Sequence, residues 1–150
     1  MYKHILVAIE NSSADRTIVE HVRQLATLTH AKLLLVHVAD GWAARHFEQL
    51  QLRESEEMRV DREYLEGLTA SLTASGLDTR WTLAMGDPAK EIVRVATEER
   101  VDLIAMSTHG HRWLNDVIRG MTADRVRHDV TIPVLLLRAQ GVARPETAGA

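Results

Sequence analysis

Residues 86–107, GDPAKEIVRVATEERVDLIAMS, hold a complete helix-to-strand unit. Gly86 supplies a turn, Asp87 is placed to cap a helix, and Pro88 suits the first helical position. The apolar run at residues 101–107 predicts a strand buried on both faces. The helical residues predicted to face inward are Ile92, Val93 and Ala96. A helix followed at once by a buried strand is typical of parallel α/β folds.

The same alternation extends towards the N-terminus. Apolar runs predict two strands, at residues 3–9 and 31–38. Between them a helical spacing of apolar residues predicts a helix over residues 13–29. Ser12 or Ser13 is available as its N-cap, and Asp15 lies in the favourable first turn.

Towards the C-terminus the pattern adds one long helix and two further strands. A helical stripe covers residues 48–74, and Gly76 is placed to end that helix. The strand predicted at residues 78–85 alternates in polarity, which favours a position near a sheet edge. The last strand is predicted at residues 132–138.

Strands that alternate with helices of this length predict an α/β fold. We expect an open five-stranded parallel sheet, doubly wound, with helices on both faces and right-handed crossovers. Ligands bind such sheets beyond the carboxyl ends of the strands, where the strand order reverses. The loops to inspect are therefore ENSS, residues 10–13, and STHGHRW, residues 107–113.

Composition narrows the class of protein. A chain of 150 residues that is 45% hydrophobic suits one domain, predicted over residues 1–138, with a flexible tail at 139–150. A net charge of −3 argues against a nucleic-acid partner or an anionic membrane surface. No apolar run reaches membrane-spanning length, and there is no cysteine, so we expect a cytoplasmic protein.

Five blocks in order resemble the universal stress protein family over nearly the whole chain up to Arg138. They are YKHILVAIENS (2–12), LLLVHV (33–38), GDPAKEIVRVA (86–96), VDLIAMSTHG (101–110) and GMTADRVRHDVTIPVLLLR (120–138). The resemblance implies the five-stranded sheet, a regulatory role in stress survival, and a homodimer joined through the last strand, Ile132 to Arg138. It does not indicate other protein partners.

Some members of this family bind ATP or AMP and others do not. Binding members are similar in having Gly, two residues, Gly, nine residues, then Gly followed by Ser or Thr, with an Asp after the first strand. In this chain Gly110 and Gly120 match the second and third glycines. Ser107, Met121 and Glu10 stand at the first glycine, the hydroxyl residue and the aspartate.

Met121 is the departure with the largest predicted effect. It removes a phosphate ligand and a helix cap together, and loss of a cap costs about 0.5 to 2 kcal/mol unless it is compensated. Met121 fits an apolar helical face with Leu114, Val117 and Ile118, so the last helix either begins at Met121 or runs through Gly120. Alternatively, Thr122 supplies the hydroxyl one residue later.

The first hypothesis is a stress-response regulator that binds ATP or AMP at the reversal of the sheet, with Mg²⁺ only if ATP is bound. Backbone amides near the two glycines and a helix N-terminus would hold the phosphates. The predicted binding residues are Ala8, Ile9, Glu10, Val38, Met106, Ser107, His109, Gly110, Gly120, Met121 and Thr122.

Two alternatives remain at the level of the sequence. One is a non-binding member, an interaction or scaffold dimer whose pocket is filled by Met121 and Trp113. The other is a slow ATP-hydrolysing enzyme, but no nucleophile with a positioned base is recognisable, so no catalytic residue is predicted. His109 and His111 lack a third ligand at motif spacing, so no metal site is predicted.

Overall fold

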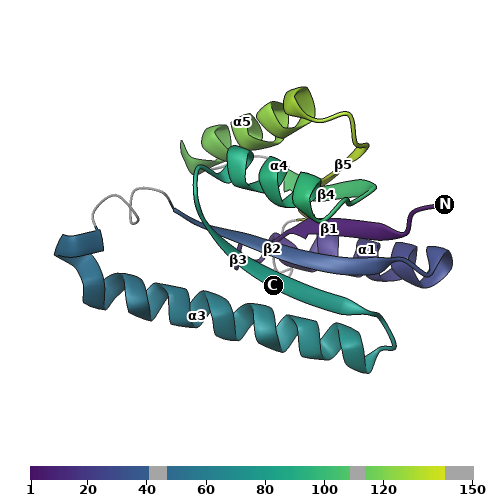
Figure 1. Ribbon diagram of the computed structural model, residues 1–150, viewed down its shortest axis with the longest axis horizontal. Helices are drawn as coiled ribbons and strands as arrows, with labels where there is room; N and C mark the ends of the chain where they lie inside the picture. Colours follow the sequence, from purple (N-terminus) through teal and green to yellow (C-terminus); the bar gives the residue numbers. More distant parts are fainter. Residues whose placement is uncertain (41–46, 109–113, 141–150) are drawn as a thin grey trace, which may run out of the picture.

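The computed structural model describes residues 1–40, 47–108 and 114–140, with side chains described for 1–39, 56–108 and 121–140. Strands and helices alternate along the chain (Figure 1). The elements are β1 (His4–Ala8), α1 (Asp15–Thr29), β2 (Lys32–Asp40), α3 (Phe47–Ala74), β3 (Thr79–Gly86), α4 (Pro88–Glu98), β4 (Leu103–Thr108), α5 (Leu114–Asp129) and β5 (Val134–Arg138). The five predicted strands are all present, and their bounds differ from the prediction by one or two residues.

The strands form one parallel sheet in the order β3-β2-β1-β4-β5. This confirms the predicted open five-stranded parallel sheet and the position of β3 at an edge. The chain moves outwards from β1 to β3 and then returns to place β4 on the other side of β1. The strand order therefore reverses between β1 and β4. These are the strands whose following segments, residues 10–13 and 107–113, were predicted to carry the ligand site.

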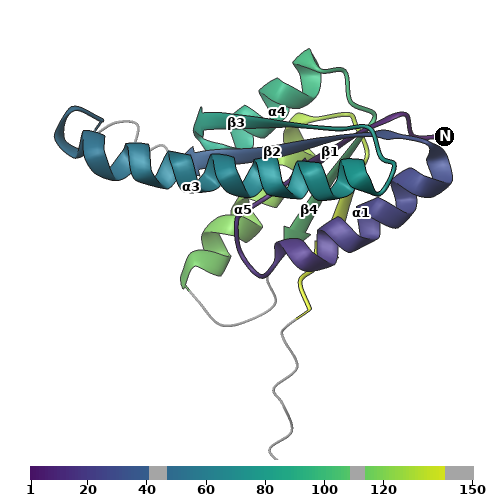
Figure 2. The same cartoon turned by 90° about the horizontal axis from the view of Figure 1, so that it is seen from below.

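Helices cover both faces of the sheet, and Figures 1 and 2 show α1 and α3 on one face and α4 and α5 on the other. Alternate residues of each strand point to opposite faces. In β1, Ile5 and Val7 pack with α1 and α3, whereas Leu6 and Ala8 pack with α4 and α5. Both faces of β1 and β4 are buried, which explains their continuous apolar runs.

The predicted turn residues near α3 and α4 are confirmed. Gly76 follows the end of α3 at φ +89°, a left-handed conformation that glycine adopts without strain. Asp87 is the N-cap of α4, where its carboxylate accepts a hydrogen bond from the Lys90 amide at 2.9 Å. The predicted inward residues Ile92 and Ala96 are buried, and Val93 is partly buried and packs against the same core. Val95, which was not predicted, is also buried.

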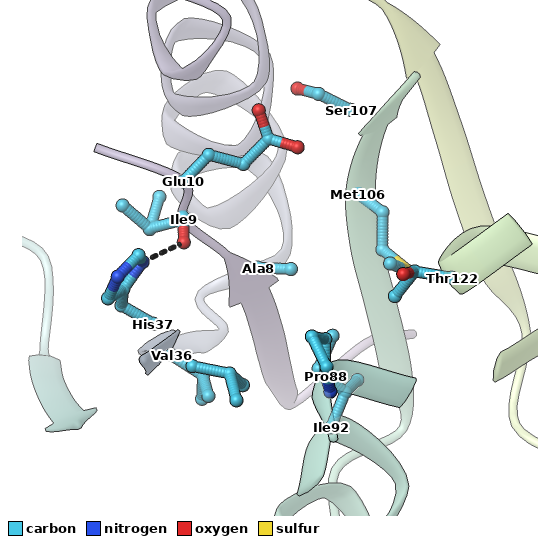
Figure 3. A pocket seen from close by; sticks show the side chains of 11 residues that line it. Ala8, Ile9, Glu10, Val36, His37, Pro88, Ile92, Met106, Ser107 and Thr122 are labelled. Atoms are coloured by element: carbon cyan, nitrogen blue, oxygen red, sulfur yellow. Dashed lines mark hydrogen bonds between the residues drawn. The ribbon is translucent and has the colours of Figure 1, made fainter. Parts of the chain in front are cut away.

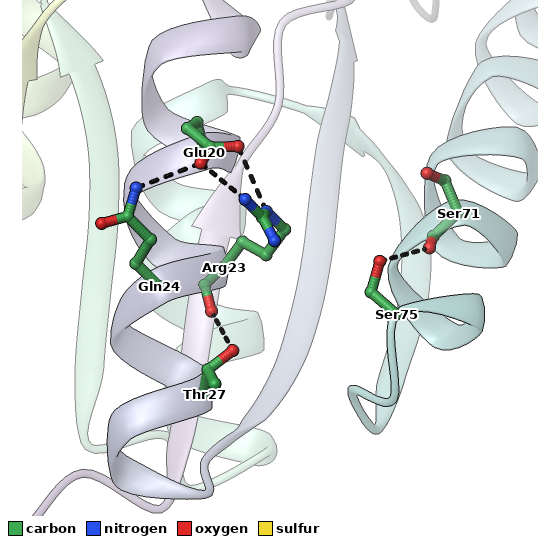
Figure 4. Close-up of polar contacts among 6 residues, drawn as sticks. All are labelled: Glu20, Arg23, Gln24, Thr27, Ser71 and Ser75. Atoms are coloured by element: carbon green, nitrogen blue, oxygen red, sulfur yellow. Dashed lines mark hydrogen bonds and ion pairs between the residues drawn. The ribbon is translucent and has the colours of Figure 1, made fainter.

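The predicted cap of α1 is wrong. The N-cap residue is Ala14, and no side chain caps the helix. Asp15 lies in the first turn of α1, as predicted, and its carboxylate turns back and is buried against the preceding loop. The exposed side of α1 carries local pairs instead, in which Glu20 accepts hydrogen bonds from Arg23 and Gln24 (Figure 4).

Candidate functional site

A cavity of about 290 Å³ lies at the carboxyl edge of the sheet, between β1 and β4. The register of the parallel strands brings three strand ends together at this edge, because Ala8 of β1 pairs with Val36 of β2 and Val7 of β1 pairs with Ala105 of β4. Residues from β1, β2, β4, α4 and α5 reach this sheet-edge cavity (Figure 3). They are Ala8, Ile9, Glu10, Val36, His37, Val38, Pro88, Ile92, Met106, Ser107 and Thr122.

The lining of the cavity has an apolar part and a smaller set of polar side chains. Its apolar groups come from the strands and from the first turns of α4, whereas its polar side chains are Glu10, His37, Ser107 and Thr122. In Figure 3 the Glu10 side chain extends from the end of β1 towards Ser107 at the end of β4. An apolar slot with a few convergent polar groups is the usual form of a site for a small organic ligand.

The loop of residues 9–14, here called the post-β1 loop, carries Glu10 to the cavity. Asp15 fixes the loop, because its carboxylate accepts hydrogen bonds from the backbone amides of Glu10 at 2.9 Å and Ser12 at 3.2 Å. The Ser12 hydroxyl accepts from the Ala14 amide and donates to Oε2 of Glu10, both at 3.3 Å. Asn11 completes the turn in a left-handed conformation at φ 57°.

Helix α3 holds the same loop from outside the cavity. The Tyr64 hydroxyl donates to Oδ2 of Asp15 at 2.9 Å, and burial together with that carboxylate raises the pKa of Tyr64. Asn11 donates to Oδ1 of Asp61 at 2.9 Å. The tyrosine therefore stays protonated and continues to donate throughout the physiological pH range.

His37 links the cavity to this network. Its Nδ1 lies 2.8 Å from the Ile9 carbonyl oxygen, and its Nε2 lies 3.2 Å from Oδ2 of Asp61. These contacts make His37 a hydrogen-bonded structural residue. It also lines the cavity, which the sequence did not indicate.

Ser107, which replaces a glycine of the family pattern, does not obstruct the cavity with its hydroxyl. The residue lies in extended backbone at the end of β4 and is buried. Its hydroxyl donates to the Ala14 carbonyl at 3.3 Å, on the side of α1. The added side chain therefore ties β4 to the start of α1.

The structure decides the question of the last helix. Gly120 and Met121 lie inside α5, which runs from Leu114 to Asp129. Amides inside a helix donate to carbonyls of the preceding turn, so this position offers no free helix N-terminus to a phosphate. Thr122, one residue later, is a hydroxyl residue of α5 that lines the cavity.

Met121 does not fill the cavity. Its side chain is 56% exposed, and it is not one of the described residues that line the cavity. The proposed apolar face is therefore wrong at Met121, because the rotation of α5 directs Thr122 inwards instead. Trp113, the other residue proposed to fill the pocket, lies outside the described residues.

His109 and Gly110 also lie outside the described residues, so their predicted roles remain predictions. Of the predicted binding residues, seven line the cavity: Ala8, Ile9, Glu10, Val38, Met106, Ser107 and Thr122. In the part of the chain that the structure describes, no group of three or more His, Asp or Glu side chains is arranged to hold a metal ion. No helix in that part is long and apolar enough to cross a membrane.

Sequence reasoning missed the contribution of α4 to the site. Pro88 and Ile92 line the cavity. Asp87 beside them forms a bidentate ion pair with Arg125 of α5, with nitrogen-to-oxygen distances of 2.9 and 3.0 Å. The signal was available, since Asp87 and Pro88 were recognised as the start of a helix. The sequence did not indicate that α4 and α5 lie on the same face of the sheet and converge at this edge.

Comparison with known proteins supports one family. The model of the universal stress protein family matches residues 1–138. Universal stress protein MJ0577 of Methanocaldococcus jannaschii is 26% identical, with 92% of this chain and 96% of that protein covered. A universal stress protein of Thermus aquaticus is 30% identical, with 92% and 100% covered.

Solved structures agree on the fold. The MJ0577 structure superposes with a TM-score of 0.78 at 26% identity and covers 95% of this chain and 99% of its own. A universal stress protein in complex with cAMP gives 0.67 at 18% identity, covering 93% and 98%. One from Archaeoglobus fulgidus in complex with dAMP gives 0.68 at 20% identity, covering 90% and 97%.

The matched residues span all five strands and both loops at the reversal of the sheet. The order of the strands and the site at their carboxyl edge agree with the motifs by which the sequence resembles this family. The chain belongs to the universal stress protein family.

Proposed function

We propose that this protein binds an adenine nucleotide, AMP or ATP, in the sheet-edge cavity and acts as a stress-response regulator through the bound state. The observation that carries the proposal is the lining of the cavity at the strand reversal. Its apolar part suits a planar base, the Glu10 carboxylate is suited to accept hydrogen bonds from the hydroxyls of a sugar, and the Thr122 hydroxyl is suited to donate to a phosphate.

The relatives add support at the level of the fold. Solved universal stress proteins hold cAMP in one case and dAMP in another, so the fold accommodates an adenine nucleotide. Val38 and its neighbours would receive the base, with Glu10 nearer the sugar. The phosphates would extend towards residues 107–110, and Mg²⁺ would accompany ATP but not AMP.

Binding without turnover is the form of the function that we propose. Membership of this family is taken to imply a regulatory role, and a regulator responds to occupancy of its site rather than to product formation. The protein would act in the cytoplasm, as a homodimer joined through β5. Phosphate release from ATP, followed over hours with purified protein, measures turnover directly.

Calorimetry tests the proposal. Purified protein stripped of nucleotide is titrated with AMP, and with ATP in the presence and absence of Mg²⁺. We expect saturable heat with AMP or ATP and little with GMP, because the apolar slot is proposed to select the base. No heat and no thermal shift up to millimolar nucleotide would refute adenine-nucleotide binding and favour the scaffold alternative.

A further inference from the structure

The carboxylate of Asp15 is the most deeply buried charged group among the described residues. Asp15 is 1% exposed, although it lies at the first position of α1. Burial of a carboxylate is costly unless hydrogen bonds and nearby positive charge compensate for the lost hydration. Here the amides of Glu10 and Ser12, the Tyr64 hydroxyl and the positive end of the α1 dipole all face it.

These contacts converge on Glu10, the one carboxylate among the described residues that line the sheet-edge cavity. Asp15 holds the Glu10 backbone directly and the Ser12 backbone beside it. Ser12 in turn donates its hydroxyl to Oε2 of Glu10. Two short connections therefore set the position and the direction of the Glu10 side chain, and both begin at Asp15.

We propose that Asp15 is a positioning residue for the nucleotide site, acting through Glu10, and that Tyr64 of α3 assists it. The inference rests on the proposed function, since it assigns Glu10 a contact with the bound nucleotide. Asp15 itself does not line the sheet-edge cavity. It lies behind the post-β1 loop, where a second cavity of about 430 Å³ opens between α1 and α3 beside Tyr64.

Because of the second cavity, we expect substitution of Asp15 to disturb the post-β1 loop more than substitution of Tyr64 does. Both oxygens of Asp15 accept from N–H or O–H donors, so an amide at this position would set an NH₂ group against one of those donors. Removal of the Tyr64 hydroxyl leaves the two backbone contacts in place. Water from the adjoining cavity can then take over the third contact.

The test compares Asp15→Asn, Tyr64→Phe and a matched control, Glu20→Gln, for AMP binding by calorimetry well below the melting temperature. Glu20→Gln makes the same carboxylate-to-amide change on the same helix, but at an exposed pair with Arg23 (Figure 4). We expect Asp15→Asn to weaken AMP binding about tenfold, which is about 1.4 kcal/mol. Tyr64→Phe should weaken it about twofold to threefold, and Glu20→Gln should not change it.

Amide NMR shifts give a readout that does not require nucleotide. We expect the amide protons of Glu10 and Ser12 to shift in Asp15→Asn but not in Glu20→Gln, because only the first substitution removes their charged acceptor. If Asp15→Asn lowers the melting temperature but leaves both the AMP affinity and these shifts unchanged, Asp15 is structural and the inference is overturned.

The two proposals fail in different ways. An unmodified protein that binds no AMP up to millimolar concentration overturns the proposed function and, with it, the nucleotide part of this inference. The NMR shifts then decide whether Asp15 holds the loop. An unmodified protein that binds AMP, with an equally tight Asp15→Asn variant, overturns the positioning role alone. If Asp15→Asn does not fold, Tyr64→Phe decides, and unchanged affinity and shifts in that variant overturn the inference.

Discussion

Thr122 is the residue at which α5 meets the sheet-edge cavity. It is partly buried, whereas its neighbour Met121 points to solvent. Adjacent helical residues are about 100° apart around the axis, so a shift of one residue exchanges a solvent-facing position for an inward one. Thr122 therefore lines the cavity in this chain, whereas the family pattern has its hydroxyl at position 121, and we propose that the Thr122 hydroxyl takes over that role.

Substitution of Thr122 by valine tests this exchange. Valine keeps the shape of threonine and removes the hydroxyl, so we expect AMP affinity to fall about fivefold, or about 1 kcal/mol for one neutral hydrogen bond. Calorimetry measures the change. Thr131→Val, the same substitution at an exposed residue beyond α5, is the control, and equal affinities in all three proteins would show that the Thr122 hydroxyl does not face the nucleotide.

At the scale of elements, the ion pair between Asp87 and Arg125 joins the N-terminus of α4 to α5. These two helices supply Pro88, Ile92 and Thr122 to the cavity, so the pair spans its α4–α5 wall. The pKa of Asp87 is lowered, mainly by its hydrogen bonds with Arg125 and to a smaller extent by the hydrogen bond from the Lys90 amide. Asp87 thus has two roles, as a helix cap and as a partner between helices.

Two substitutions of Asp87 separate these roles. Asparagine keeps the cap and removes the charge, so Asp87→Asn should lower the free energy of unfolding at pH 7 by less than about 1 kcal/mol, as is typical of a half-exposed pair. Asp87→Ala also loses the cap, which costs about 1 kcal/mol more. Urea denaturation measures both values, and equal losses in the two variants would show that the cap contributes nothing.

The effect of pH on Asp87 has a definite sign. Because its folded-state pKa is lowered, the carboxylate stabilises the fold above the unfolded-state value of about 3.9. This contribution is lost as the pH falls through the lower folded-state value. The difference between the unmodified protein and Asp87→Asn should therefore be constant near neutrality and vanish in strong acid, and a difference that persists there would contradict the assigned cause.

The elements also show which parts of the structure were predictable from sequence. Apolar runs and local turn residues located the strands, the end of α3 at Gly76 and the start of α4 at Asp87, because each depends on neighbours within a few residues. The start of α1 was not predictable in this way. Asp15 is held by Tyr64, which lies 49 residues away, and no local pattern reports that contact.

The residues of the candidate site also fall into a group that local patterns predicted and a group that depends on long-range packing. Residues at the ends of β1, β2 and β4 were found, since parallel strands end at one edge and the switch point is a rule of the fold. Thr122 was also named from the family pattern, but the choice between it and Met121 depended on the rotation of α5. The residues contributed by α4, and the place of His37 in the site, depend on how elements distant in the sequence pack together at this edge of the sheet. That information is carried by long-range packing rather than by any motif in the chain.

At the scale of the whole molecule, β5 forms one open edge of the sheet. β5 pairs with β4 on one side only, and its apolar sequence VLLLR is partly exposed along its length. Leu136 in the middle of the strand is 37% exposed. An apolar edge strand left open is prone to associate with other chains, so burial against a second copy through β5 would remove both the open edge and the exposed leucine.

A charge at this edge should therefore dissociate the proposed dimer. We expect the unmodified protein to sediment as a dimer at micromolar concentration and Leu136→Lys to sediment as a monomer, because a lysine ammonium at the centre of an apolar interface loses hydration without a partner. Leu28→Lys places the same charge on an exposed leucine of α1 and should remain dimeric. A monomeric unmodified protein would refute the dimer itself, while a dimer that survives Leu136→Lys would locate the interface away from β5.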